Sequence, residues 1–193
     1  MAKNHLLPRY LLWTIVCICL LLHSGFLIPA HTESSPAENP LQKIYHAEIG
    51  IREVSGHNDG TRIATYLRYC GLNEGYSWCA AFVSWCHGQA GYSQPRNAWA
   101  AALFPTARRV NDPRTGDVFG LYDRQLRRIA HCGFVDDWGD TYCITVEGNT
   151  GPDGALAIAD LSGNPIRAGP SAQGVYRKRR PVRTIHAVAR WQE

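Results

Sequence analysis

The order in which helical and strand patterns follow one another constrains the fold of this chain most strongly. Apolar residues recur at helical spacing in three segments of the first half, residues 41–49, 63–70 and 78–90. Short apolar runs bounded by turn residues fill the second half, and we expect strands over residues 118–122, 130–136, 141–147, 174–180 and 184–191. Helices first and strands second is typical of an α+β domain with helices packed on an antiparallel sheet.

The N-terminal segment predicts export. Lys3 and Arg9 precede an uncharged apolar run, residues 11–22, and a candidate small-residue cleavage site follows at residues 28–30. This order of basic, apolar and small residues is typical of a secretory signal. Because the apolar character extends over residues 10–28, an uncleaved membrane anchor is the alternative.

This interpretation divides the chain into three parts. We expect residues 1–30 to be a signal peptide or membrane anchor, residues 31–40 a polar linker, and residues 41–193 one folded domain. Within that domain, residues 148–172 are rich in Gly and Pro and predict a long loop. An exported protein of this kind would be periplasmic, membrane-anchored or extracellular.

Composition excludes several classes of protein. The 193 residues suffice for one domain with a hydrophobic core, and 45% apolar against 19% charged residues is ordinary for a globular chain. The net charge is +4, and without Lys3 and Arg9 the balance is 18 basic against 16 acidic residues, or +2. That excess of positive charge is too small to predict nucleic-acid binding. Separately, we expect the protein to be a monomer.

Cys79 is the strongest candidate for a nucleophile. Ser77 is a good N-cap residue, which would place Cys79 in the first turn of the third helix. There the unpaired backbone N–H groups and the helix dipole favour a thiolate. The same N–H groups can donate to an oxyanion when the sulfur attacks a carbonyl. From this stretch alone, a small buried hydrophobic residue is the alternative interpretation.

His131 and Glu147 are predicted to face each other in a hairpin whose turn centres on Gly139. Opposed residues have Cβ atoms roughly 4.5–5.5 Å apart, so the carboxylate can orient the imidazole while its other nitrogen takes a proton from a thiol. Asn149 could orient the ring in the same way or support Glu147. This register gives a core face made of Cys132, Phe134, Tyr142, Ile144 and Val146. An idle surface ion pair is the alternative.

Four motifs together resemble the CHAP domain, a family of cysteine- and histidine-dependent amidohydrolases and peptidases in the papain-like superfamily. They are the stretches 78–85 (WCAAFVSW), 113–117 (PRTGD), 131–134 (HCGF) and 147–150 (EGNT). The resemblance implies a papain-like α+β fold and cleavage of an amide bond in the peptide part of bacterial peptidoglycan. It implies neither a metal nor an organic cofactor.

The resemblance also assigns roles. Cys79 corresponds to the nucleophile, His131 to the base and acid, Glu147 to the orienting carboxylate, and Asn149 to a fourth residue of the site. Many papain-like enzymes place a Gln shortly before the nucleophile as an oxyanion donor, and this chain has none among residues 74–78. The Cys79 N–H is the expected donor, assisted by the side chain of Tyr76 or Ser77.

Two further functions are compatible with the same motifs. One is an acyl transferase, or a hydrolase of another amide, which would use the same thiol chemistry. The other is a catalytically inactive module that binds the cell wall. A binding module has no need of the complete set of Cys79, His131 and Glu147, so we favour the hydrolase.

The remaining cysteines and histidines leave alternatives open. Four cysteines besides Cys79 lie in the predicted domain, and they are Cys70, Cys86, Cys132 and Cys143. They could form two disulfides or remain free buried thiols. A zinc site from three of them and His87 lacks paired close spacings, so we expect no metal. His57 and His87 are expected to be solvated.

Two other features have a structural and a functional interpretation each. Trp99 could be a core aromatic residue or line a substrate groove. Residues 177–180 and Arg183 form a basic cluster, which could protect an edge strand from aggregation or attract anionic wall polymer or lipid.

Overall fold

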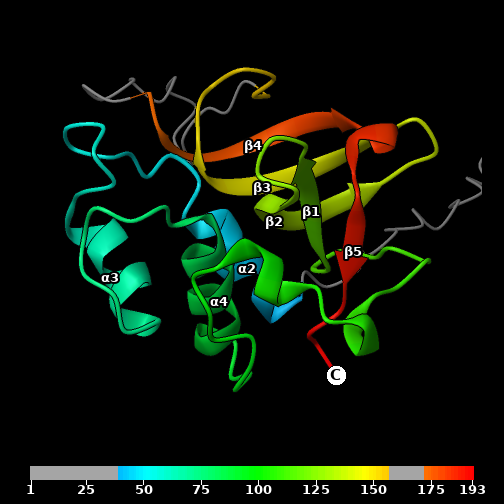
Figure 1. The fold of residues 1–193 in the computed structure, drawn as a ribbon, viewed down its shortest axis with the longest axis horizontal. Helices are drawn as coiled ribbons and strands as arrows, with labels where there is room; N and C mark the ends of the chain where they lie inside the picture. The colour runs from blue at the N-terminus through cyan, green and yellow to red at the C-terminus, as the bar shows by residue number, and fades with distance from the viewer. Residues whose placement is uncertain (1–38, 157–171) are drawn as a thin grey trace, which may run out of the picture. The chain divides into compact units, whose positions relative to one another are not determined.

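The computed structural model describes residues 39–156 and 172–193 (Figure 1). The predicted signal or anchor segment and most of the predicted linker lie outside the described residues. Within the unit from Glu38 to Glu193, one antiparallel sheet with the strand order β4-β3-β2-β1-β5 lies over three helices. The expectation of an α+β fold with helices packed on an antiparallel sheet is confirmed.

The elements follow the predicted order. The α-helices are α2 (Pro40–Ala47), α3 (Thr61–Tyr69) and α4 (Cys79–Gln89). The strands are β1 (Val118–Asp123), β2 (Arg128–Trp138), β3 (Tyr142–Thr150), β4 (Gly174–Pro181) and β5 (Ala187–Ala189). Short 3-10 helices are η1 (Ala100–Leu103), η2 (Thr106–Arg108) and η3 (Val182–Thr184). The strand expected over 184–191 is shorter, since η3 ends at Thr184 and β5 covers only Ala187–Ala189.

Helix α4 is the central helix of the core. Every residue from Cys79 to His87 is buried, so the helix is enclosed on all sides rather than on one apolar face. Small residues on α4 let neighbouring elements approach, while Phe82 packs its ring edge-on against Phe134 of β2 and Tyr66 of α3. The nucleophile candidate therefore begins a rigid element.

Helix α2 is fastened to the sheet through a buried carboxylate. The Asn39 side chain caps the helix by accepting from the backbone N–H groups of its first turn, and Pro40 follows at a position where no donor is needed. Asp136 of β2 accepts hydrogen bonds from Tyr45 and is paired with His46 at 2.6 Å. These contacts fix the first described helix against the middle of the sheet.

The predicted register of the β2–β3 hairpin is wrong by two residues at Phe134 and Val135 and by three beyond the bulge that follows. Phe134 lies opposite Val146 instead of Ile144, and beyond a bulge Asp137 lies opposite Ile144. A shift of two residues leaves each side chain on its own face, so alternation of apolar residues cannot detect it. Tyr142, expected on the core face, is exposed because it lies at the end of the strand.

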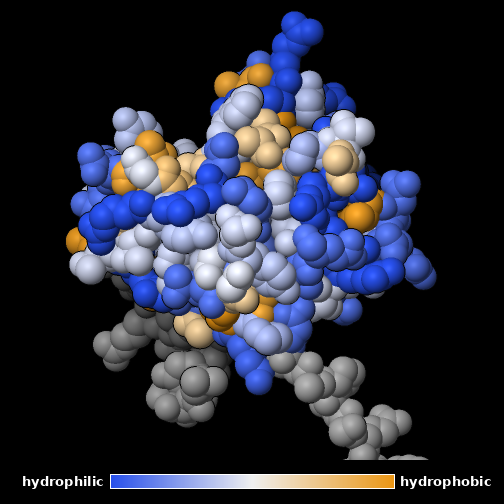
Figure 2. All heavy atoms as spheres, turned by 90° about the horizontal axis from the view of Figure 1, so that it is seen from below, coloured by the Kyte–Doolittle hydropathy of each residue, from blue (hydrophilic) through white to orange (hydrophobic). Residues whose placement is uncertain are grey.

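The surface on the helix side of the molecule is mostly hydrophilic, with apolar side chains in small separate groups (Figure 2). Within residues 39–156 and 172–193, no helix has both the length and the apolar character needed to cross a membrane. The segment 10–28, the predicted anchor, lies outside this part of the chain.

Candidate active site

Cys79 lies in the first turn of α4, as the sequence predicted, but it is the first residue of the helix and the cap differs. Trp78 and not Ser77 occupies the N-cap position, and its side chain makes no capping hydrogen bond. The expectation for Ser77 is wrong because the helix begins one residue later than a Ser77 cap requires. Cys79 is only 4% exposed, and the first N–H groups of α4 have no partner within the helix.

His131 and Glu147 meet in the structure although they are not directly opposite each other. The distance from His131 Nε2 to Glu147 Oε2 is 2.9 Å. Gly133 makes room for this contact, because a Cβ there would come within 3.0 Å of Glu147 Cγ and 2.6 Å of the Val146 carbonyl oxygen. The carboxylate therefore reaches the ring diagonally across the two strands.

Cys79 lies against the same histidine. The Cys79 sulfur accepts hydrogen bonds from the Cys132 thiol and from His131. Because Glu147 occupies Nε2 of the ring, Nδ1 is the nitrogen left for the sulfur. The structure thus brings Cys79, His131 and Glu147 into one hydrogen-bonded row.

These contacts shift the pKa values of all three groups. The hydrogen bonds from Cys132 and His131 lower the pKa of the Cys79 thiol well below its usual value. Burial lowers the pKa of His131, but its bonds to Cys79 and Glu147 outweigh burial and raise that pKa to about 9. Burial raises the pKa of Glu147, but bonds from Arg180 and His131 lower it to about 2. The favoured state is therefore thiolate, imidazolium and carboxylate.

Cys132 is a contact that sequence reasoning missed. Its place on the core face of β2, beside Phe134, was expected, and it is fully buried. The hydrogen bond to Cys79, together with burial, raises the pKa of Cys132 well above its usual value. Cys79 thus ionises, while Cys132 keeps its proton and donates a hydrogen bond to the Cys79 sulfur. Only the packing of α4 on β2 brings the two sulfurs together, and no local pattern signals it.

Asn149 points to the loop before α4 and not to His131. Its Oδ1 accepts from the Trp78 backbone N–H at 3.1 Å, and its Nδ2 donates to Glu53 Oε1 at 3.2 Å and Asn58 Oδ1 at 2.9 Å. Its φ of 57° lies in the left-handed region, which Asn tolerates better than most residues. Asn149 therefore fixes the backbone immediately before the sulfur.

Glu53 is a second residue that sequence reasoning missed. Its side chain is 2% exposed and also accepts from Trp78 Nε1 at 2.9 Å and from the Asn58 N–H at 3.0 Å. With Asn149 it forms a polar network buried around the N-cap of α4. A Glu that follows a helix in a polar loop gives no sequence signal for this role.

The other candidate residues are accounted for separately. His57 is exposed as expected, whereas His87 is fully buried, contrary to expectation. Its Nδ1 lies 2.9 Å from the Val83 carbonyl oxygen, and burial lowers its pKa to about 4. It is buried because α4 is enclosed to its last turn. In the described part of the chain all five cysteines are free, and no cluster of three metal-binding side chains is found.

The basic cluster on β4 is divided between different partners. β4 is an edge strand of the sheet, as expected if the basic cluster protects an edge from aggregation. Arg177 Nε binds Asp136 at 2.6 Å, Lys178 Nζ binds Thr150 Oγ1 at 3.0 Å, and Arg179 lies over the ring of Tyr142. Arg180 binds Glu147. All four charges of residues 177–180 are therefore engaged within the protein.

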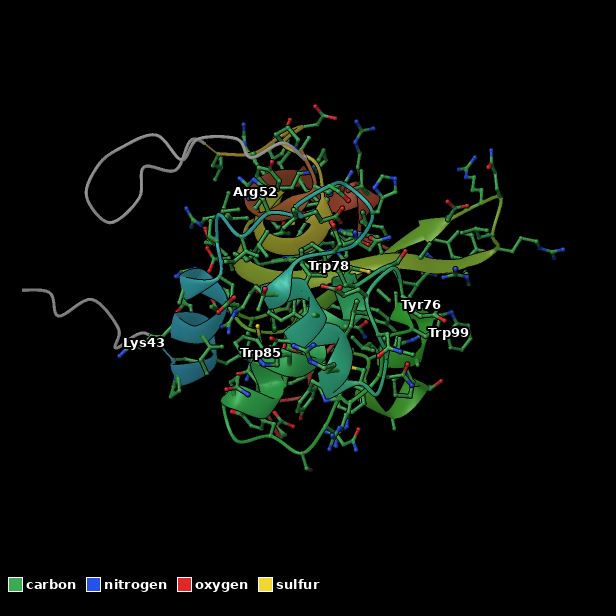
Figure 3. All side chains as sticks on the ribbon, turned by 90° about the vertical axis from the view of Figure 1, so that its left-hand side faces the viewer. Lys43, Arg52, Tyr76, Trp78, Trp85 and Trp99 are labelled. Carbon is green, nitrogen blue, oxygen red and sulfur yellow. The ribbon has the colours of Figure 1, made fainter. Side chains whose placement is uncertain are left out.

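An open groove lies beside the start of α4. Tyr76 and Trp99 line it and are 57% and 56% exposed, and Figure 3 shows both side chains at the same edge of the molecule. Ser77, two residues before Cys79, belongs to the same lining, and the cavity volume is about 440 Å³. The core interpretation of Trp99 is wrong, since half of its surface is exposed.

Comparison with known proteins agrees with this geometry. Residues 71–149 match the family model of the CHAP domain, and the match includes α4 and strands β1 to β3. No curated protein matches the chain. CHAP domains are typically hydrolases that act on peptidoglycan, so the match implies peptidoglycan-hydrolase activity. Residues 71–149 are therefore similar to the CHAP domain, and Cys79, His131 and Glu147 lie inside the matched segment.

Proposed function

We propose that the protein is a thiol hydrolase that cleaves an amide bond in the peptide part of peptidoglycan, with Cys79, His131 and Glu147 as a catalytic triad. The observation that carries this proposal is the hydrogen-bonded row in which Glu147 holds one nitrogen of His131 and Cys79 occupies the other. A sulfur at a helix start with a lowered pKa is the activated nucleophile that such chemistry needs.

The reaction proceeds in two halves. The Cys79 thiolate attacks the carbonyl carbon, and the resulting oxyanion is stabilised by the unpartnered N–H groups at the start of α4, of which that of Cys79 is nearest. His131 gives its proton to the leaving amine, and a thioester remains on Cys79. His131 then takes a proton from water, which attacks the thioester and releases the acid and the free thiolate.

Glu147 keeps the imidazole in place through both halves. Its bond to Nε2 holds the ring so that Nδ1 faces the sulfur, and its negative charge stabilises the imidazolium. Asn149 and Glu53 support the same reaction from the other side, because they fix the backbone of Trp78 next to the attacking sulfur.

The groove lined by Tyr76 and Trp99 supplies a binding surface, and its lining includes Ser77, two residues before Cys79 in the chain. Exposed aromatic side chains offer large, rigid contact areas to a ligand at a small cost in conformational entropy. We place the part of the substrate that adjoins the scissile bond in this groove, and we assign to the Tyr76 or Ser77 side chain the assisting role at the oxyanion.

The test is mass spectrometry of purified muropeptides incubated with the protein. The expected result is a new pair of fragments whose masses identify the amide bond. Cys79→Ser should abolish them, whereas Cys86→Ser, which changes another buried cysteine of α4, should not. Circular dichroism checks that both variants are folded. Binding of muropeptides without any cleavage by the unmodified protein would contradict the proposal and favour a wall-binding module.

We also propose that the protein works outside the cytoplasm, where peptidoglycan lies. The basic and apolar order of residues 1–30 supports this location. The test is N-terminal sequencing of the protein recovered from fractionated cells. A start near residue 31 would indicate a cleaved signal, and an intact N-terminus in the membrane fraction would indicate an anchor. An uncleaved protein in the cytosol would contradict the proposal.

A further inference from the structure

Glu147 is held by more donors than its bond to His131 requires. Its Oε1 accepts from Thr145 Oγ1 at 2.5 Å and from Arg180 Nε, and its Oε2 accepts from Arg180 Nη2 at 2.6 Å and from His131 Nε2 at 2.9 Å. A carboxylate offers about four acceptor positions, so these four donors saturate it. The three hydrogen bonds from Thr145 and Arg180 fix the carboxylate, and its remaining acceptor position is the one that binds the imidazole.

Arg180 reaches this carboxylate from outside the segment that matches the CHAP domain. It lies on β4, opposite Cys143 of β3, and the arginine side chain is only 21% exposed. Arg177 and Arg179 alternate with it along the strand and bind other partners. The two nitrogens of Arg180 meet the two oxygens of Glu147 as a planar fork, a geometry that a lysine cannot reproduce.

We propose that Arg180 is a positioning residue, which keeps Glu147 ionised and turned toward His131. Its effect on catalysis rests on the proposed function, but its effect on the site does not. Arg180 binds both oxygens of the carboxylate, and Oε2 is also the oxygen that binds His131. Arg180 acts on Cys79 only through Glu147 and His131.

Several charged and titratable groups besides Arg180 interact with Glu147 and would remain if Arg180 were replaced. Besides His131, the charge of Glu147 acts on Lys178 of β4, Cys132 of β2 and Cys143 of β3. Lys178 is bound to Thr150 and the Gly151 carbonyl oxygen, so the hydrogen bonds of its ammonium go to partners other than the carboxylate. Arg180 is thus the one cation on β4 that binds Glu147 directly among the described residues.

The first readout is independent of peptidoglycan. It is the rate at which iodoacetamide alkylates Cys79, followed by mass spectrometry of the Cys79 peptide as a function of pH. Without Arg180, Glu147 should take up a proton at higher pH, because the hydrogen bonds from Arg180 lower the pKa of that carboxyl. His131 then loses its charged partner, and the thiolate is less stabilised. Arg180→Gln should therefore move the acid side of the profile to higher pH.

Arg179→Gln is the matched control, because it removes the same charge from the neighbouring position of β4 without touching Glu147. Its profile should coincide with that of the unmodified protein. Arg180→Lys keeps the charge but not the fork, and its profile should lie between the two. If Arg180→Gln does not fold, Arg180→Lys against Arg179→Lys decides the question, and coincident profiles would overturn the proposal.

The second readout is the hydrolysis of muropeptides. Arg180→Gln removes both charge-assisted hydrogen bonds to Glu147 and should lower kcat roughly tenfold to a hundredfold, while KM stays within about twofold. Combined with Glu147→Gln, it should add little further loss, since both act through the same carboxylate. Additive losses would overturn the proposal. If the unmodified protein cleaves nothing but the alkylation profiles differ as expected, the proposed function fails and the role of Arg180 stands.

Discussion

Replacing Glu53 by Gln should destabilise the protein measurably although Glu53 lies outside the proposed triad. The carboxylate is 2% exposed and accepts three hydrogen bonds, two at Oε1 and one at Oε2. A glutamine keeps one oxygen and presents an NH₂ group in place of the other. If the glutamine oxygen accepts from Trp78 and Asn149, its NH₂ group faces the Asn58 N–H, and two donors then meet without an acceptor between them.

The size of the effect follows from this count. One buried donor loses its acceptor, which costs roughly 1–3 kcal/mol. The two bonds that remain lose the assistance of the negative charge, while removing a buried charge recovers part of the loss. We expect a net loss of about 2 kcal/mol for Glu53→Gln. Glu53→Ala leaves Trp78 Nε1 and the Asn58 N–H without their acceptor and Asn149 Nδ2 with Asn58 Oδ1 alone, and it should cost roughly twice as much.

Urea unfolding followed by tryptophan fluorescence measures both losses. The control is Glu74→Gln, which changes an exposed glutamate whose Oε1 accepts from the Gly60 N–H at 3.0 Å. Its unfolding free energy should change by less than about 0.5 kcal/mol. If Glu53→Gln and Glu74→Gln unfold at the same urea concentration, the buried network around the start of α4 does not contribute to stability, and the reasoning is refuted.

Three further predictions concern the site itself. Because the pKa of Cys79 is lowered, alkylation of Cys79 should vary little with pH across neutrality, and an alkylation profile centred near the ordinary thiol value of about 8.5 would contradict this. Because the pKa of His131 is raised to about 9, hydrolysis should fall as the pH rises through about 9. Cys132→Ala removes a donor to the thiolate, so alkylation of Cys79 at about pH 6 should slow by roughly tenfold, and an unchanged rate would show that the hydrogen bond has no effect. Trp99→Ala should raise KM for muropeptides roughly fivefold and leave kcat unchanged, whereas equal losses in kcat and kcat/KM would place Trp99 outside substrate binding.

The parts of the fold that depend on local sequence could be predicted. The apolar pattern and the small residues around Cys79 specify a buried helix, and the alternation around His131 and Glu147 specifies a hairpin. Both motifs are short, and the segment that matches the CHAP domain contains both. Local patterns were enough to identify the elements that carry the three proposed catalytic residues.

The register and the supporting contacts could not be predicted for a physical reason. A two-residue slip preserves the faces of both strands, so the pattern that identified the hairpin could not show that Gly133, not His131, lies nearest to Glu147 in the ladder. The partners of Glu53 and Arg180 depend on packing between segments far apart in the chain. His87 was expected at the surface because a helix end usually is, and only the enclosure of α4 buries it.

The pairing of β4 with β3 has a consequence for the order of events during synthesis. Cys79, His131 and Glu147 leave the ribosome before Arg180 does, since the chain is made from its N-terminus. Until β4 has been made and has added its edge to the sheet, the carboxylate lacks two of its four donors. Contacts between distant segments form late because loop closure must precede them. A nascent or truncated chain that ends before β4 therefore lacks the two hydrogen bonds with which Arg180 holds Glu147.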